Sequence, residues 1–441
     1  MGNLPSVSIC PVCDLDADDD DSVGHEFSSE QNKSGVYREG ANGVSFRSNL
    51  SSCKMIIPTQ MLHGREGLRV LGFEYRTVRS GAGGRNGACT RRLHHVATNQ
   101  IITQHNSRIH IPSCLFSEVT RCCQDIAQDV LLKEGGLERL MVREEDDKIR
   151  TVALVTRRSD DDNVTLETCS LSEDGSRSTA SEESCRPTLL VISGRGRSRA
   201  GIFSRKQLLV SGIEAATALN TVKEGRKRGL NVVLMDHYSQ QDPTSQVDTM
   251  DAFESSLETI FGDGHEQDES SWHSSSDAFD SSRGPVFVLA HSASGGKLVI
   301  SLLEGKARRY LLPRICGIVF TDSTHNIQWC SGVQRVWDLL ESQKCLYIRS
   351  NEVRSSSSWR DGDETRRAGG EVSVDTFWEH RFGTIRTVWA GTADHSLMNV
   401  KSADIIWDHF DKLLAGRSSS GGRSDVNLGE AHHGALTHVP S

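Results

Sequence analysis

Short, almost wholly apolar segments recur from residue 188 onward, and stretches with helical spacing lie between them. The segments are TLLVIS (188–193), NVVLMD (231–236), VFVLA (286–290), ICGIVFT (315–321), CLYIR (345–349) and TIRTVWA (384–390). Strands that are apolar along their whole length are typical of a parallel sheet covered by helices on both faces. The alternation therefore predicts an α/β fold with a mostly parallel sheet flanked by helices.

The segment ahead of this sheet predicts an additional N-terminal piece. Residues 69–78, a Gly-rich stretch and the segment CTRRLHHVA indicate two strands joined by a loop. Apolar residues then recur at intervals of three and four between Phe116 and Val130, which predicts a helix that Gly135 and Gly136 end. We expect a hairpin followed by a helix.

Polar segments without periodicity set the expected domain boundaries. The hydrophobic content is 36%, low for a chain that folds along its whole length. We expect a disordered leader over 1–66, one folded domain over 67–414 and a disordered tail over 415–441. Three flexible insertions, all polar, are expected at 144–186, 239–283 and 353–376.

Composition excludes several classes of function. The net charge of −9 argues against binding nucleic acid by bulk electrostatics. No apolar run is long enough to span a membrane, and no signal peptide opens the chain, so we expect a soluble intracellular protein. The start fits a pattern for N-myristoylation at Gly2, although acidic residues follow it. A lone CxxC pair, Cys10 and Cys13, is a weak zinc signal, and we expect no metal and no cofactor.

The segment 286–297 ends an apolar run at Ser292 and then opens a helix with small residues. A serine at such a turn is typical of a nucleophile elbow, in which the hydroxyl projects above the edge of a parallel sheet. The usual glycines two positions before and after are replaced by Ala290 and Ser294. Ser294 fits the pattern almost as well, but Ser292 lies directly at the strand end. A serine that caps the next helix explains the same residues equally well.

Acidic and histidine side chains follow later strands. Asp322 follows the segment 315–321, Glu352 follows 345–349, and His395 follows 384–390. Since the carboxyl ends of parallel strands share one edge of the sheet, a serine, an acid and a histidine in this order predict a hydrolase triad. The sequence does not choose between Glu352 and Asp322. His395 could also cap a helix.

The loop after the first apolar segment is rich in glycine and arginine. Its backbone N–H groups, with that of the residue after Ser292, could stabilise an oxyanion. The candidate anion-binding residues are Gly194, Gly196, Arg199, Gly201 and Ala293. Arg195, Arg197 and Arg199 could instead bind phosphate or RNA, because the guanidinium fork matches phosphate geometry.

Several motifs together resemble one known family. They are FEYRTV (73–78), LLVISGRGRSRAG (189–201), GLNVVLMD (229–236), VFVLAHS (286–292), VFTDSTHN (319–326) and AGTADH (390–395). Their order over roughly 68–414 resembles the Arb-two domain family, which includes the yeast Argonaute-binding protein and animal cotranscriptional regulators.

The resemblance implies an α/β-hydrolase-like fold with an N-terminal extension. It also implies a nuclear or nucleocytoplasmic scaffold that binds Argonaute, chromatin or RNA-processing proteins in small-RNA-directed silencing. The family's serine maps to Ser292, its histidine to His395 and its acids to Asp322 and Glu352. Relatives carry glycine where Ser294 stands, and a His-Gly pair at 193–194. A scaffold is therefore the first hypothesis, and a serine hydrolase acting on an ester is the second.

Overall fold

The computed structural model describes most of the folded part of the chain. The described residues are 63–79, 89–143, 149–157, 186–194, 198–236, 249–262, 284–350, 368–372 and 376–420. The chain divides into two compact units, where the sequence predicted one domain over 67–414. Unit 1 comprises 1–127 with 204–214, and unit 2 comprises 128–203 with 215–441.

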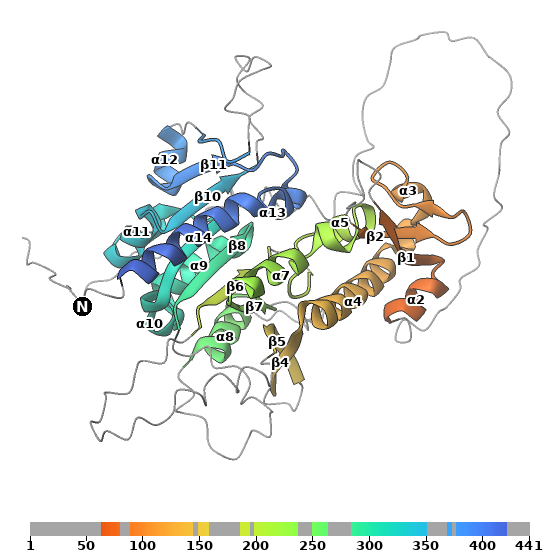
Figure 1. Ribbon diagram of the computed structural model, residues 1–441, viewed down its shortest axis with the longest axis horizontal. Helices are drawn as coiled ribbons and strands as arrows, with labels where there is room; N and C mark the ends of the chain where they lie inside the picture. Colours follow the sequence, from red (N-terminus) through yellow and green to blue (C-terminus); the bar gives the residue numbers. More distant parts are fainter. Residues whose placement is uncertain are drawn as a thin grey trace, which may run out of the picture. The chain divides into compact units, whose positions relative to one another are not determined.

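Unit 1 is built on a small antiparallel sheet in the order β1-β2-β3 (Figure 1). The predicted hairpin is present, and it pairs Phe73 with His95 and Arg79 with Cys89. Arg91 fixes the far side of the hairpin through a 2.6 Å ion pair with Glu214. The elements are α2 (Gly64–Val70), β1 (Phe73–Arg79), β2 (Cys89–His95), β3 (Gln100–Ile101), α3 (Ser107–His110), η3 (Ser113–Leu115), α5 (Arg205–Val210) and the first turns of α4 (Phe116–Gly135).

Unit 2 contains an eight-stranded sheet in the order β11-β10-β9-β8-β6-β7-β5-β4. The strands from β6 to β11 run parallel, whereas β5 is antiparallel to both of its neighbours. This is the strand order and direction of the α/β-hydrolase fold. The strands are β4 (Leu137–Arg143), β5 (Ile149–Thr156), β6 (Thr188–Ile192), β7 (Asn231–Met235), β8 (Val286–His291), β9 (Ile315–Thr321), β10 (Cys345–Arg349) and β11 (Arg386–Trp389).

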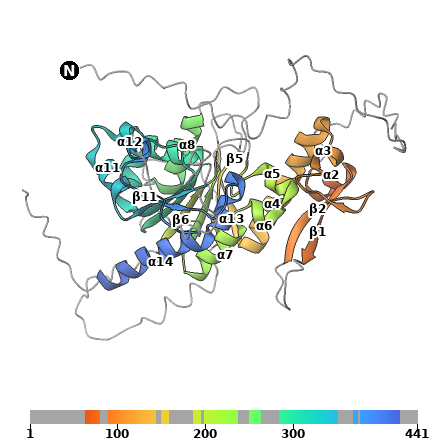
Figure 2. The same cartoon turned by 90° about the horizontal axis from the view of Figure 1, so that it is seen from above.

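Helices cover both faces of this sheet (Figure 2). Phe253 of α8, Leu298 of α9 and Trp378 of α12 belong to the core cluster on one face, and Phe410 of α14 packs on Phe287 on the other. The helices are α6 (Ile213–Ala216), α7 (Leu219–Lys227), α8 (Thr249–Phe261), α9 (Ala293–Glu304), α10 (Ala307–Tyr310), η6 (Leu312–Arg314), η7 (Ile327–Cys330), α11 (Gln334–Glu341), α12 (Thr376–Phe382), η9 (His395–Leu397), α13 (Met398–Lys401) and α14 (Ala403–Ser420).

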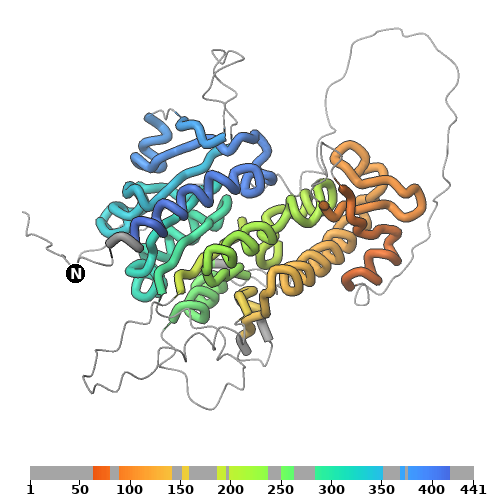
Figure 3. Tube along the Cα trace, viewed as in Figure 1, coloured from red at the N-terminus to blue at the C-terminus, as the bar shows by residue number. Residues whose placement is uncertain are grey.

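The apolar strands and the alternating helices confirm the predicted fold class. Segments far apart in sequence lie side by side, as β6 and β8 do through the pairing of Thr188 with Val286 (Figure 3). α14 continues to residue 420, inside the expected tail, and β5 lies within the expected insertion 144–186, where the sequence had indicated one strand near 152–155. Among the described helices, none has the length and apolar character needed to cross a membrane.

Candidate active site

Ser292 lies in the sharp turn between β8 and α9. Its backbone has φ 57° and ψ −133°, a region that residues other than glycine rarely adopt. Its N–H donates to the carbonyl of Thr321 over 2.9 Å, so the neighbouring strand β9 holds the turn. The side chain does not cap α9, and it makes no hydrogen bond to any described residue. The strained turn therefore presents an uncommitted hydroxyl, as an elbow does and a capping serine does not.

Small residues let neighbouring loops approach this turn. A methyl group at Gly295 would lie 2.0 Å from Oγ of Ser323, and one at Gly296 would lie 3.0 Å from Oγ1 of Thr324. A methyl group at Gly194 would lie 3.1 Å from Cβ of Ser292. The loops after β6 and β9 thus pack directly against the elbow, which requires glycine at the facing positions.

Ser294 has a different environment from Ser292. It is fully buried, and its Oγ lies 3.0 Å from the carbonyl oxygen of Ile192 and 2.7 Å from that of His291. Its hydroxyl therefore ties the end of β6 to the end of β8. This structural role explains how the chain accommodates a serine where a full elbow motif has glycine, and it leaves Ser292 as the candidate nucleophile.

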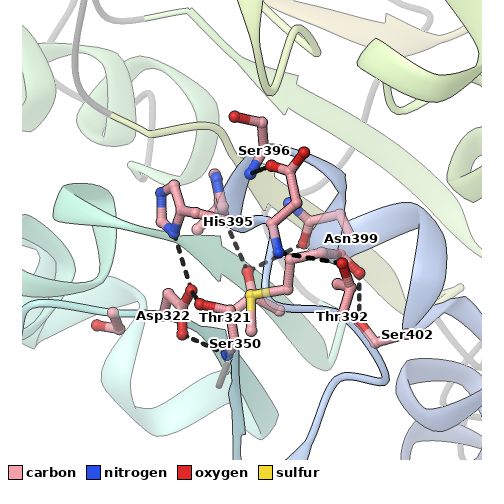
Figure 4. Close-up of polar contacts among 12 residues, drawn as sticks. Thr321, Asp322, Ser350, Thr392, His395, Ser396, Asn399 and Ser402 are labelled. Carbon is pink, nitrogen blue, oxygen red and sulfur yellow. Dashed lines mark hydrogen bonds and ion pairs between the residues drawn. The ribbon is translucent and has the colours of Figure 1, made fainter. Parts of the chain in front are cut away.

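His395 is paired with Asp322 (Figure 4). Nδ1 of His395 donates to Oδ2 of Asp322 over 2.9 Å. Asp322 follows β9 and, like Ser292, has a positive φ, 44°. Of the two acids that the sequence left open, Asp322 makes this contact, and Glu352 lies outside the described residues. The acid is thus at the end of β9.

Ser350, which directly follows β10, holds the Asp322 carboxylate. Its backbone N–H donates to Oδ1 over 2.8 Å, and its hydroxyl donates to Oδ2. Burial raises the pKa of Asp322, but the hydrogen bonds from His395 and Ser350 outweigh burial, and the pKa lies below its usual value. Because an ionised carboxylate only accepts, the proton of neutral His395 lies on Nδ1 and the lone pair lies on Nε2.

A second imidazole supports His395. The ring of His291, the residue before Ser292, stacks on it with centroids 4.6 Å apart and planes inclined by 27°. Nδ1 of His291 lies 3.0 Å from Oγ1 of Thr321, which donates to Oδ1 of Asn399 over 2.9 Å. Burial, with the neighbouring His395, lowers the pKa of His291 to about 3, so this ring is neutral. The stack places His395 beside the elbow.

The candidate anion-binding residues lie in different environments. Ala293 is the first residue of α9, where the N–H has no acceptor within the helix, and Gly194 packs against Ser292. Gly201 has φ 73° and packs against Leu131 and Leu234, so it has a packing role away from the elbow. Arg199 is half-buried. Gly196, like Arg195 and Arg197, lies outside the described residues.

Three residues of this site were not predicted: His291, Ser350 and Asn399. Ser350 directly follows an apolar strand, so the rule that selected Glu352 could have found it. His291 and Asn399 carry no signal in the sequence beyond their nearness to Ser292 and His395. Within the described part of the chain, no three potential metal ligands lie close enough together to hold an ion.

Comparisons with known proteins add little to this geometry. No protein-family model and no curated protein matches the chain. Among solved structures, a histone deacetylase from Saccharomyces cerevisiae is similar at 10% identity and TM-score 0.35, covering 67% of this chain and 98% of that one. MGS-M1, an alpha/beta hydrolase enzyme from a deep-sea metagenome library of the Medee basin, is similar at 10% identity and TM-score 0.30, covering 64% and 99%. Likenesses this low carry no argument about function.

The strand order, the strained serine turn and the histidine–aspartate pair together define the class. Unit 2 is an α/β-hydrolase-like domain, and its candidate catalytic groups lie at the carboxyl ends of β8, β9 and β11.

Proposed function

We propose that this protein is a serine hydrolase that cleaves an ester or a related acyl substrate. The observation that carries the proposal is the 2.9 Å bond between His395 and Asp322 at the sheet edge that also bears the Ser292 turn. A histidine fixed by a carboxylate, beside a serine in strained geometry, is the arrangement that activates a hydroxyl nucleophile.

The chemistry follows from the positions of the polar atoms. Oγ of Ser292 attacks the acyl carbon while Nε2 of His395 takes the hydroxyl proton, and the C–O bond to the leaving alcohol then breaks as His395 returns the proton. Asp322 stabilises the imidazolium. The N–H of Ala293 faces the developing oxyanion. A water molecule activated by His395 then hydrolyses the acyl-enzyme.

No hydrogen bond joins Ser292 to His395 in the described structure. This contact is often long in substrate-free hydrolases and tightens once substrate is bound. The substrate carbonyl would enter between the elbow and the loop after β6, where Gly194 lies against Ser292. Reactivity toward a small electrophile therefore tests the proposal more directly than the resting geometry does.

A fluorophosphonate probe reports the activated serine. We expect the folded protein to be labelled on Ser292, and Ser292→Ala to abolish labelling. Ser294→Ala is the matched control, because it removes the neighbouring hydroxyl, which is buried and bonded to carbonyl oxygens, and should remain labelled. An unlabelled folded wild type, or label that persists in Ser292→Ala, would refute the proposal.

We also propose, from the resemblance alone, a scaffold role in the nucleus with Argonaute, chromatin or RNA-processing partners. What supports it is that the motifs VFVLAHS, VFTDSTHN and AGTADH supply Ser292, Asp322 and His395, so the shared residues gather at one edge. Affinity purification followed by mass spectrometry should recover such partners with both wild type and Ser292→Ala. Recovery of none of these classes would exclude the scaffold role without bearing on catalysis.

A further inference from the structure

A groove lined by arginines lies between α10, η6 and α11. Its volume is about 400 Å³, and Arg308, Arg309 and Arg335 line it together with Gly305, Leu312 and Pro313. η6 leads directly into the first residue of β9, so the groove lies near the amino end of a strand whose carboxyl end bears Asp322 (Figure 1). A strand of this length spans about 20 Å. The groove is therefore separate from the candidate active site.

Within the part of the chain that the structure describes, the three arginines have no acidic partner. All three are exposed, and none forms an ion pair with a carboxylate in the described part of the chain. Their neighbours differ: Lys306 binds Glu258 over 2.8 Å, and Arg314 donates to the carbonyl of Gly284 over 2.8 Å. Glu258 thus pairs with Lys306, and the carboxylate of Glu254 lies against Gly305, while no ion pair among the described residues neutralises the three arginines.

The charge of the groove departs from that of the whole chain. Residues 305–314 contain four basic residues and no acidic one, although the chain carries a net charge of −9. Like charges gathered around one cavity repel each other, so the cluster lowers the stability of the fold unless an anion is bound. A cluster without structural pairing in an acidic protein indicates a binding role.

We propose that this groove binds a phosphate-bearing ligand of nucleotide size. Guanidinium groups match phosphate oxygens through paired hydrogen bonds. The exposed Pro313, with the small exposed part of Leu312, offers an apolar surface for the organic part of the ligand. The volume lies within the range of small-molecule sites. The phosphate could belong to a free nucleotide or to the backbone of a single-stranded RNA, which present the same group.

Binding of a fluorescently labelled short oligouridylate to the full chain, with unlabelled uridine monophosphate as competitor, tests the proposal. The variant Arg308→Gln/Arg309→Gln/Arg335→Gln should weaken binding at least tenfold. For the RNA it should also reduce the slope of log affinity against log salt by about 2, since each phosphate contact to a single strand contributes about 0.7. If uridine monophosphate displaces the labelled RNA, a free nucleotide is sufficient for binding. If the RNA binds and the mononucleotide does not compete, the groove binds the phosphates of the RNA backbone.

A matched control removes the same charge elsewhere. Lys227 and Arg386 are exposed and Lys223 is half-buried, and they pair with Glu224, Glu371 and Glu134 respectively. Their triple replacement by Gln should leave binding within about twofold, since the groove is intact. Without ligand, the groove variant should melt at or slightly above the wild-type temperature, because it loses no ion pair of the described residues and relieves the repulsion among the three arginines. Equal weakening in both variants, full binding by the groove variant, or no binding of either probe to wild type overturns the proposal. None of these results depends on whether Ser292 reacts.

Discussion

Replacing Asp322 by asparagine should disable the proposed triad through the tautomer of His395. The backbone N–H of Ser350 donates to Oδ1 of Asp322 and cannot turn away, so the amide oxygen of the introduced side chain must occupy that place. The amide nitrogen then occupies the place of Oδ2, which faces Nδ1 of His395. Since this nitrogen donates, Nδ1 must accept, and the imidazole proton moves to Nε2. In this state His395 cannot take the proton of Ser292.

The loss should be about 10³- to 10⁴-fold in kcat/KM, because the variant removes both the correct tautomer and the charge that stabilises the imidazolium. This corresponds to about 4 to 5.5 kcal/mol of transition-state stabilisation. Hydrolysis of a p-nitrophenyl ester and the rate of fluorophosphonate labelling measure it. Asp394→Asn is the matched control: this carboxylate caps the N–H of Ser396 over 2.9 Å, a bond that an amide oxygen also accepts. If Asp322→Asn retains more than a tenth of wild-type activity, the assigned acid is wrong.

Three further results are expected. Ser350→Ala should lower kcat about 10- to 100-fold with little change in KM, because it removes a donor to a charged acceptor. Gly295→Ala should destabilise the fold by about 1 to 3 kcal/mol in urea unfolding, since the added methyl group collides with Oγ of Ser323. Burial holds the pKa of both His291 and His325 at about 3. In the unfolded chain both imidazoles take up protons below about pH 6.5, whereas in the folded chain they stay neutral at pH 5.5. The free energy of unfolding should therefore be about 3 kcal/mol lower at pH 5.5 than at pH 8. In His325→Gln this difference should be about half as large.

The central strands could be predicted because burial on both faces leaves a continuous apolar run. The outer strand β4 could not, since LERLMVR mixes charged and apolar residues without a period of two and Met141 is half-exposed. The apolar residues Ile213, Ala216, Leu219 and Val222 have the spacing of one helix, but the structure breaks this segment between α6 and α7. There Thr217 pairs with Ile202, and the N–H of Ala218 donates to Gly201 over 2.8 Å. These contacts join different segments of the chain, so no local sequence pattern predicts them.

The sequence could predict those features of the candidate site that depend on the sheet topology alone. Ser292, Asp322 and His395 follow strands of one parallel sheet, and the sheet brings strand ends together whatever the loops contain. The choice between two acids was not predictable, because it depends on loop conformation. Asp322 reaches His395 from a positive φ, which its sequence does not require. The stacked ring of His291 likewise depends on a side-chain orientation that packing sets.

Backbone hydrogen bonds connect Ser292 and Asp322, the two residues of the site that have positive φ. Ser292 donates its N–H to Thr321, the residue before Asp322, and its carbonyl accepts from Thr324 over 3.3 Å. Each unusual backbone conformation costs about 1 to 3 kcal/mol and persists only when the surroundings hold it. Here the pairing of β8 with β9 holds both at once, and Asp322 is fixed further by its N–H bond to Ile348 of β10. An acid at the end of β9 is thus bonded through the backbone to the nucleophile turn. A change that moves β9 relative to β8 should therefore displace the serine and the acid together.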